Sequence, residues 1–358
     1  MSKLPWQKSG LAYLRARAGA AQHPERWHGW GKRRNYFEGW YCKLVVPDLD
    51  LAYAFIPGLS LEPDGSGHAF LQVLDGARSR VAYHKYELAD FVPADDTFDL
   101  KIGPHRFWDE GAEIHLPNLN AFVLFKTCKR WPRSPLAPGV MGWYGFVPGM
   151  ECYHGLVSAH HQLSGWLEDD RGRHDLQDGI GYMEKDWGSS FPAAWVWLQS
   201  NHLTDFPGRA SLMASVARIP WRGAHFRGFL CTWLWEDELQ IFTTWNNSKH
   251  EVHFGDGFVD LHFRRSERSS KVSILAQALA DRDAGSERSA KTELKIRAYP
   301  ASGGNLVSPT PSGMAGKINE SLKATLDITY LINGQVAYTG QAEWAGLEVS
   351  ERAQEILT

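Results

Sequence analysis

Two carboxyl groups share one face of a short segment in the middle of the chain. In residues 181–187, alternation places Tyr182, Glu184 and Asp186 on the same side of an extended strand. Glycine, serine and proline residues at 188–192 form a turn that ends this strand. The sequence therefore predicts a pair of acids that point the same way beside a turn.

A second strand follows the turn and carries indole rings beside amides. Alternation places Trp195, Trp197, Gln199 and Asn201 on one face. Acids beside indole faces could carry out proton-driven chemistry on an apolar substrate. The alternative is a structural corner in which Lys185 forms a salt bridge with one of the acids, since charged pairs beside turns are mostly structural.

A third acid lies in an aromatic strand closer to the N-terminus. Alternation over residues 36–44 puts Glu38 on one face with Tyr36 and Trp40. A carboxyl group in such surroundings must be protonated, paired or exposed. A pair with one of the basic residues at 32–34 is the structural interpretation, and a protonated acid is the functional one.

Histidines occur near the middle of the chain as His154, His160 and His161. A catalytic zinc site needs three protein ligands in suitable geometry, and the sequence contains no H-E-x-x-H or facial-triad pattern. We therefore predict no metal, and we expect a hydrogen-bonded histidine in a β-pocket instead.

The chain of 358 residues is rich in aromatic side chains, with 16 Trp, 17 Phe and 12 Tyr. Aromatic residues favour strands, so the composition indicates a β-protein with a large apolar interior or ligand site, or else a Trp-rich core. The net charge of −3 gives no sign of a nucleic-acid partner. The cysteines, Cys42, Cys128, Cys152 and Cys231, lack C-x-x-C spacing and are typical of free thiols in a reducing cytoplasm.

Short alternating or apolar runs, separated by turn residues, fill most of the chain. This regular spacing predicts antiparallel barrels or sandwiches. The chain length and an aromatic strand motif that occurs at 36–43 and again at 182–187 indicate two domains, 26–180 and 181–358, after a basic extension at 1–25. We expect an all-β protein of two antiparallel barrels with few short helices.

An aromatic loop interrupts the pattern at 130–148, where prolines and glycines exclude a strand ladder. Loops of this length in compact domains are usually functional or disordered, so we expect a lid or a pocket wall. Further along, we expect a strand at 272–279 and an exposed polar loop at 281–291.

The N-terminal extension carries Leu11, Leu14, Ala18 and Ala21 at helical spacing, together with basic residues. A short helix of this kind could make peripheral contact with an anionic membrane surface. The alternative is an extension that frays or docks on the domain. The sequence contains no run of about 18 apolar residues that would span a membrane.

The chain resembles the tocopherol cyclase family. The motifs that carry this resemblance are Phe37-Glu38-Gly39-Trp40-Tyr41-Cys42-Lys43, Met150-Glu151-Cys152 with His154-Gly155, residues 181–192 with Trp197 and Gln199, and the tail Ala345-Gly346-Leu347-Glu348-Val349. Relatives of this family include carotenoid hydratases and fungal intramolecular Diels–Alderases. The resemblance implies two lipocalin-like barrels around a hydrophobic ligand site. Plant members carry a plastid-targeting extension, whereas this N-terminus is short and poor in serine, so we expect a cytoplasmic protein of bacterial type that could contact membranes through its N-terminal extension.

The resemblance also implies a reaction and roles for the residues. Tocopherol cyclases close a prenylated quinol to a cyclic ether without oxidation or a cofactor, by protonating an alkene. Asp186 is then expected as the proton donor, with Glu184 as its partner and Glu38 as the next acid. The expected substrate contacts are Trp40, Tyr41, His154, Tyr182, Trp187, Trp195, Trp197, Gln199 and Asn201. The alternatives are a non-catalytic carrier of a hydrophobic ligand, a hydratase and a pericyclase.

Overall fold

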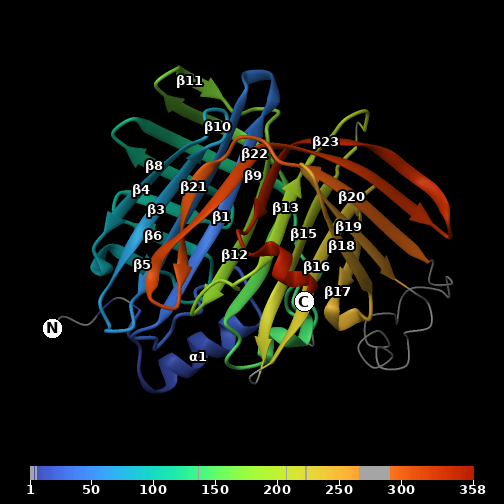
Figure 1. Cartoon of the computed structure of the whole chain (residues 1–358). Helices are drawn as coiled ribbons and strands as arrows, with labels where there is room; N and C mark the ends of the chain where they lie inside the picture. The colour runs from blue at the N-terminus through green and yellow to red at the C-terminus, as the bar shows by residue number, and fades with distance from the viewer. Residues whose placement is uncertain (1–3, 5, 136, 207, 222–223, 266–290) are drawn as a thin grey trace.

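The computed structural model describes residues 4, 6–135, 137–206, 208–221, 224–265 and 291–358. These residues form two antiparallel sheets, each curved into a lipocalin-like barrel, which lie side by side (Figure 1). The expected all-β fold of two antiparallel barrels is confirmed. The strand expected at 272–279 and the loop expected at 281–291 lie outside the described residues, apart from Lys291.

The first sheet is built from the N-terminal half of the chain, and its neighbouring strands are all antiparallel. In spatial order its strands are β4 (Arg80–Tyr86), β3 (Gly67–Asp75), β2 (Leu51–Leu61), β1 (Tyr36–Val46), β12 (Ile180–Gly188), β10 (Cys152–Asp169), β9 (Leu119–Lys129), β8 (Gly111–Leu116), β7 (His105–Trp108), β6 (Asp99–Ile102) and β5 (Phe91–Pro93), with β11 (Gly172–Asp175) beside β10.

The second sheet is built from the C-terminal half. Its strands in spatial order are β17 (Glu238–Thr243), β16 (Ala224–Trp235), β15 (Ser211–Trp221), β13 (Trp195–Ser200), β23 (Gln335–Val349), β22 (Gly313–Ile332), β20 (Thr292–Tyr299), β19 (Phe258–Arg265) and β18 (Lys249–Gly255), with β14 (His202–Leu203) beside β23 and β21 (Gly304–Thr310) beside β22. The Gln72 side chain of β3 joins the two sheets, because its amide accepts from the Val307 N–H of β21 at 2.7 Å and donates to the Val307 carbonyl at 3.3 Å.

Helix is scarce in the described residues. The α-helix is α1 (Gly10–Ala21), and short 3₁₀ turns occur at Pro47–Leu49, Leu88–Asp90, Gly142–Phe146, Thr244–Asn246 and Ala353–Leu357. No helix in this described part of the chain has the length and apolar character needed to cross a membrane.

The chain changes sheets later than residue 180. The strand β12 pairs with β1 on one side and with β10 on the other, so it belongs to the first sheet. The second sheet begins at Trp195, and the boundary between the sheets therefore lies between Gly188 and Trp195. The repeated aromatic motif does not mark two domain starts, because its copies are the neighbouring strands β1 and β12, with Trp40 opposite Lys185.

Alternation along the central strands separates the apolar residues into three clusters. On β1, Trp40 and Leu44 face the core of the first barrel, whereas Tyr41 and Val45 face a cluster that lies between the two sheets. On β13, Val196 belongs to the core of the second barrel, and its neighbouring indoles point toward the first sheet. The central strands are thus buried on both faces.

The N-terminal extension docks on the first barrel. Trp6 is fully buried and packs edge-on against Trp27 and Phe91. The helix α1, below the first sheet in Figure 1, buries the small residues Ala16 and Ala20. Two leucines of the helix remain exposed, and membrane contact through them stays a prediction.

Candidate active site

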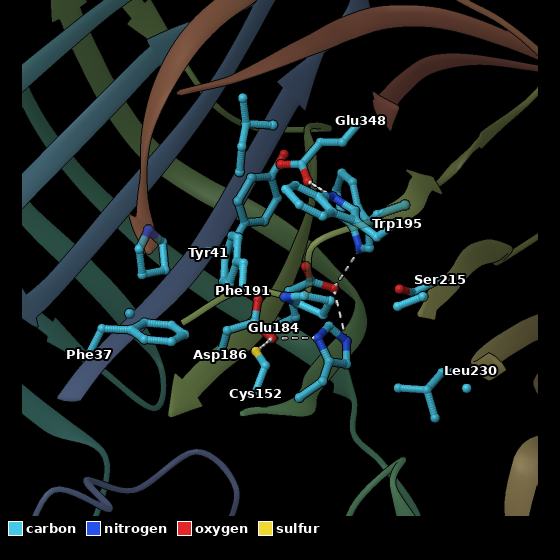
Figure 2. A pocket seen from close by; sticks show the side chains of 18 of the residues that line it. Phe37, Tyr41, Cys152, Glu184, Asp186, Phe191, Trp195, Ser215, Leu230 and Glu348 are labelled. Carbon is cyan, nitrogen blue, oxygen red and sulfur yellow. Dashed lines mark hydrogen bonds and ion pairs between the residues drawn. The ribbon is translucent and has the colours of Figure 1, made fainter. Parts of the chain in front are cut away.

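A cavity of about 190 Å³ lies between the two sheets. Its first wall is the outer face of β1, β10 and β12, and its second wall is formed by β13, β15, β16, β22 and β23. Residues of β2, β3 and β21 also line the cavity. Met141 and Tyr144 from the aromatic loop line it too, so this loop is a pocket wall as predicted. The lining is mostly apolar and aromatic, and Figure 2 shows charged side chains gathered among the rings.

One polar cluster joins His154 on β10 to two acids on β12. His154 lies opposite Asp186 in the strand pairing, and its Nδ1 is 2.9 Å from Oδ1 of Asp186. Its Nε2 is 3.4 Å from Oε2 of Glu184. Burial opposes the charged imidazolium, but the carboxylates of Glu184 and Asp186 outweigh it and raise the pKa of His154 well above its ordinary value. His154 is therefore a positive charge held between two carboxylates.

Two further donors hold Glu184 in place. The Tyr182 hydroxyl donates to Oε2 of Glu184 at 2.5 Å, and Trp197 Nε1 donates to the same oxygen at 3.2 Å. Glycine at Gly346 lets the Trp197 ring lie against β23, because a Cβ there would be 2.7 Å from the indole. The two donors to the Glu184 carboxylate thus come from β12 and β13, one strand of each sheet.

A second acidic pair lies on the opposite wall. Glu320 on β22 and Glu348 on β23 are direct neighbours in the strand pairing, and both line the cavity. The Tyr41 hydroxyl donates to Oε1 of Glu320, and Trp195 Nε1 donates to Oε2 of Glu348 at 2.8 Å (Figure 2 shows the second contact).

Both of these carboxyl groups favour the neutral form. Burial and the nearby Glu348 raise the pKa of Glu320 well above its ordinary value. Burial, with Glu184 and Asp186 nearby, raises the pKa of Glu348 to about 8, against the opposing effect of the Trp195 hydrogen bond. Both shifts favour the protonated, neutral acids over the carboxylates.

The sequence patterns did not single out this pair as functional. Glu320 occupies a position in a β22 face that is otherwise apolar at Ile318, Leu322 and Ala324, and an acid in such a run is a detectable signal. Glu348 lies in the tail motif but 28 residues further along the chain than Glu320, and only the pairing of β22 with β23 brings the two together.

Glu38 faces away from the cavity, into the first barrel. It forms a fully buried ion pair with Lys185 and accepts a hydrogen bond from the Tyr36 hydroxyl. The backbone N–H of His28 donates to both Glu38 oxygens, at 2.9 Å to Oε1 and 3.0 Å to Oε2. Burial would raise the pKa of Glu38, but Lys185 and His28 lower it overall. The paired interpretation is therefore correct, with Lys185 as the partner in place of residues 32–34.

Two indoles expected to contact substrate also lie on this inner side. Trp40 and Trp187 flank Lys185, whose Nζ is 4.8 and 4.7 Å from their ring centroids. Trp40 stacks on Phe98 in the barrel core. Trp187 stacks on Tyr153. These rings support the Lys185 ion pair and lie on the opposite side of the sheet from Glu184.

Gln199 and Asn201 are buried where the sheets meet, beside the cavity lining. Lys43 Nζ donates to Oε1 of Gln199 at 2.9 Å and to the Trp344 carbonyl at 2.6 Å. The Asn201 amide donates to the Ala159 carbonyl at 2.9 Å. These contacts support the structural interpretation, in which the amides satisfy groups at a strand end. Burial lowers the pKa of Lys43 to about 7, although Glu320 and Glu184 oppose this.

The structure therefore brings together part of the predicted set. Tyr41, His154, Glu184, Asp186, Trp195 and Trp197 line the cavity, and Tyr182 supports Glu184 from behind. His154 is the expected hydrogen-bonded histidine, whereas His161 is buried elsewhere and contacts Ser158.

The spacing of His154, Glu184 and Asp186 would allow metal binding, since their donor atoms lie within 4.8 Å of one another. A histidine ligand must offer a deprotonated nitrogen to a metal. Both ring nitrogens of His154 instead face carboxylate oxygens, and its raised pKa favours the imidazolium. With a protonated His154 these three side chains form an ion-pair cluster, and we predict that they hold no metal.

A second cavity of about 610 Å³ adjoins the first, because Met141, Met150 and His154 line both. Tyr13 of α1 and Trp187 of β12 form part of its other walls. The two cavities together reach from the acidic groups to the side of the protein that α1 covers.

Comparisons with known proteins agree with this architecture. Residues 125–350 match the family model described as tocopherol cyclase-like. The chain is 24% identical over 246 residues to a probable chloroplastic tocopherol cyclase of Oryza sativa subsp. japonica, and 24% identical over 247 residues to the chloroplastic tocopherol cyclase of Zea mays. Each match covers 53% of this chain and 51% of the relative, so the chain spans about half the length of these relatives.

Among solved structures, that of CghA is similar to this chain over 88% of both proteins, with a TM-score of 0.53 and 12% identity. At that identity the likeness concerns the fold alone. It agrees with the arrangement of paired barrels described above.

Proposed function

This chain belongs to the tocopherol cyclase-like family, and we propose that it is a cofactor-independent enzyme that closes a prenylated quinol, or a related isoprenoid, to a cyclic ether. One observation carries this proposal. The cavity between the barrels combines an apolar, aromatic lining with carboxyl groups whose pKa values are raised. Alkene protonation needs such neutral acids in a dry site.

The reaction is an isomerisation with no change in oxidation state. An acid transfers its proton to one carbon of a trisubstituted alkene, and a tertiary cation forms at the other carbon. The phenol oxygen attacks that cation, the C–O bond forms, and the phenolic proton returns to the protein. Positioning the oxygen against the alkene supplies part of the rate enhancement.

Aromatic rings in the cavity are suited to stabilise the cation. Trp195 and Trp197 line it from β13, and Tyr41 packs edge-on against Trp197 with ring centroids 5.4 Å apart. A cation over such a ring gains about 0.5–2 kcal/mol. The paired carboxylates around His154 add negative potential on the same wall.

The sizes of the two cavities suit an elongated substrate. Small-molecule sites commonly enclose about 300–1,000 Å³, so the acidic cavity, at about 190 Å³, would enclose only the reacting part of a prenylated quinol. The adjoining cavity of about 610 Å³ would hold the remaining apolar tail.

The test is to incubate the protein anaerobically with a farnesyl-substituted hydroquinone and to analyse the extract by chromatography and mass spectrometry. Ring closure gives a product of identical mass with altered retention and absorbance. A mass gain of one water would identify a hydratase instead. Unchanged quinol that co-purifies with the protein would identify a carrier and contradict the proposal.

A further inference from the structure

Glu320 and Glu348 of the second sheet form a carboxyl pair that lines the cavity between the two sheets. They are directly opposite residues of neighbouring antiparallel strands, whose side chains lie on one face within contact range. Both line the cavity, on the wall that faces the His154 cluster. The pair is thus placed where a substrate alkene would lie.

Glu320 has a carboxyl oxygen without a hydrogen-bond partner among the described residues. Its Oε1 accepts a hydrogen bond from Tyr41, whereas Oε2 is buried and has no hydrogen-bond partner among the described residues. An unpartnered buried carboxylate oxygen is costly. A proton on Oε2 removes the buried negative charge, and the resulting O–H group meets no acceptor among the described residues.

The charges around the pair also favour the neutral acid. From β12, Glu184 and Asp186 face it with the imidazolium of His154 between them, which leaves a net charge of −1 on that wall. Lys43 on β1 is the nearby basic group, and its ammonium is hydrogen-bonded to Gln199 and the Trp344 carbonyl, with a pKa that burial lowers to about 7. Ionising both glutamates would add two negative charges to the same buried space, so the pair retains a proton.

We propose that Glu320 is the catalytic acid of this cavity and that Glu348 is its carboxyl partner, an assignment that rests on the proposed function. The Oε2–H bond of Glu320 breaks as a C–H bond forms on the substrate alkene. The phenol oxygen then bonds to the tertiary carbon. Its O–H bond breaks, and the proton returns to the pair, which restores the starting state.

This assignment gives the His154 cluster a different role from the one that the sequence indicated for Asp186. Nδ1 of His154 is hydrogen-bonded to Asp186, and Nε2 is ion-paired with Glu184 at 3.4 Å, so the imidazolium lies between the two acids. The net negative charge of the cluster faces the developing cation. Asp186 is then a residue that stabilises charge, and Glu320 is the residue that delivers the proton.

The test compares Glu320→Gln with wild type, using a farnesyl-substituted hydroquinone. Loss of a general acid costs about 10²–10⁴ in rate, so we expect turnover to fall by that factor while quinol binding, measured by quenching of Trp fluorescence, stays within about threefold. The matched control is Glu343→Gln, an exposed acid on β23, which should turn over like wild type. Wild-type-like turnover by a folded Glu320→Gln variant would overturn the proposal.

A second measurement does not depend on the substrate. Infrared spectroscopy at neutral pH should detect the carbonyl stretch of a protonated, buried carboxylic acid in wild type, and Glu320→Gln should weaken this band. If wild type fails to convert the quinol but shows the band, the proposed function is wrong and the protonated pair remains. If wild type converts the quinol and the band is unchanged in Glu320→Gln, the assignment of the acid is wrong.

Discussion

Glu38 and Lys185 form a fully buried ion pair. The pair lies on the face of β1 and β12 that points away from the cavity between the sheets. Lys185 also lies between the rings of Trp40 and Trp187. Burial lowers the pKa of Lys185 to about 8, although Glu38 opposes this. The pair therefore joins the two central strands of the first sheet and takes no part in the proposed reaction.

Removing one partner of this pair should destabilise the fold. Glu38→Gln leaves Lys185 as a buried charge with a weaker partner, and breaking such a pair costs about 3–5 kcal/mol. Chemical denaturation should show this loss, while turnover per folded molecule stays near that of wild type. The double variant Glu38→Leu with Lys185→Met should regain much of the stability. A folded Glu38→Gln protein with unchanged stability and no turnover would instead make Glu38 a catalytic acid.

The protonation state of His154 should depend on Asp186. Loss of an opposite charge in contact shifts a pKa by about 1–3 units, so Asp186→Asn should lower the pKa of His154 by that amount. Nitrogen-detected NMR titration of the imidazole measures it, with Glu168→Gln, an exposed acid on β10, as the control. An unchanged titration would contradict the ion-pair cluster.

The same variant separates the two candidate acids. If Glu320 delivers the proton, Asp186→Asn should retain at least about ten times the turnover of Glu320→Gln, since it loses charge stabilisation and keeps the general acid. A larger loss in Asp186→Asn than in Glu320→Gln would return the proton-donor role to Asp186.

Turnover should fall at alkaline pH. Ionisation of Glu348, whose pKa is raised to about 8, places a negative charge beside Glu320 and makes Glu320 a weaker acid toward the alkene. We expect the rate to drop by about tenfold per pH unit beyond this point, and Glu348→Gln should displace the alkaline limb. A flat profile from pH 7 to 10 would argue against a carboxylic acid as the donor.

Stability should depend on pH in the same direction. The folded protein keeps protons on Glu320 and Glu348 that the unfolded chain releases above the ordinary carboxyl pKa of 4.5. The free energy of unfolding therefore declines as pH rises from about 4.5 to about 8 through this pair. In Glu348→Gln, thermal melts over that range should show a smaller decline, and an unaltered slope would contradict the raised pKa.

Chelators and added divalent metals should leave turnover unchanged, because the ring nitrogens of His154 are directed at the carboxylates of Glu184 and Asp186. Metal analysis by mass spectrometry, with activity assays after EDTA and after zinc, checks this. Stoichiometric zinc in active protein, lost together with activity on chelation, would show that the cluster is a metal site.

The alternation of side chains could be predicted from the sequence because it is a local property of strands. On β12, Tyr182 and Glu184 do share one face, and Met183 lies on the other. The sequence could not indicate which face meets the cavity, since β1 and β12 are buried on both sides. For this reason Glu38 and Trp40 were assigned to the site, although they face the barrel core.

The other residues of the site come together through contacts between strands that are far apart in the sequence. Tyr41 and Glu320 are 279 residues apart, and their hydrogen bond exists only because β22 packs beside the first sheet. The sheet boundary after Gly188 follows from the hydrogen-bonding edges of β1 and β10. Neither fact has a local sequence pattern.

The most direct test of the account is turnover of the farnesyl-substituted hydroquinone by wild-type protein in D₂O, followed by NMR of the product. Proton delivery from a solvent-exchanging carboxylic acid predicts one deuterium per product molecule, bonded to the former alkene carbon that does not bear the new C–O bond. A cyclised product with no deuterium on carbon would contradict proton delivery as the step that this cavity catalyses.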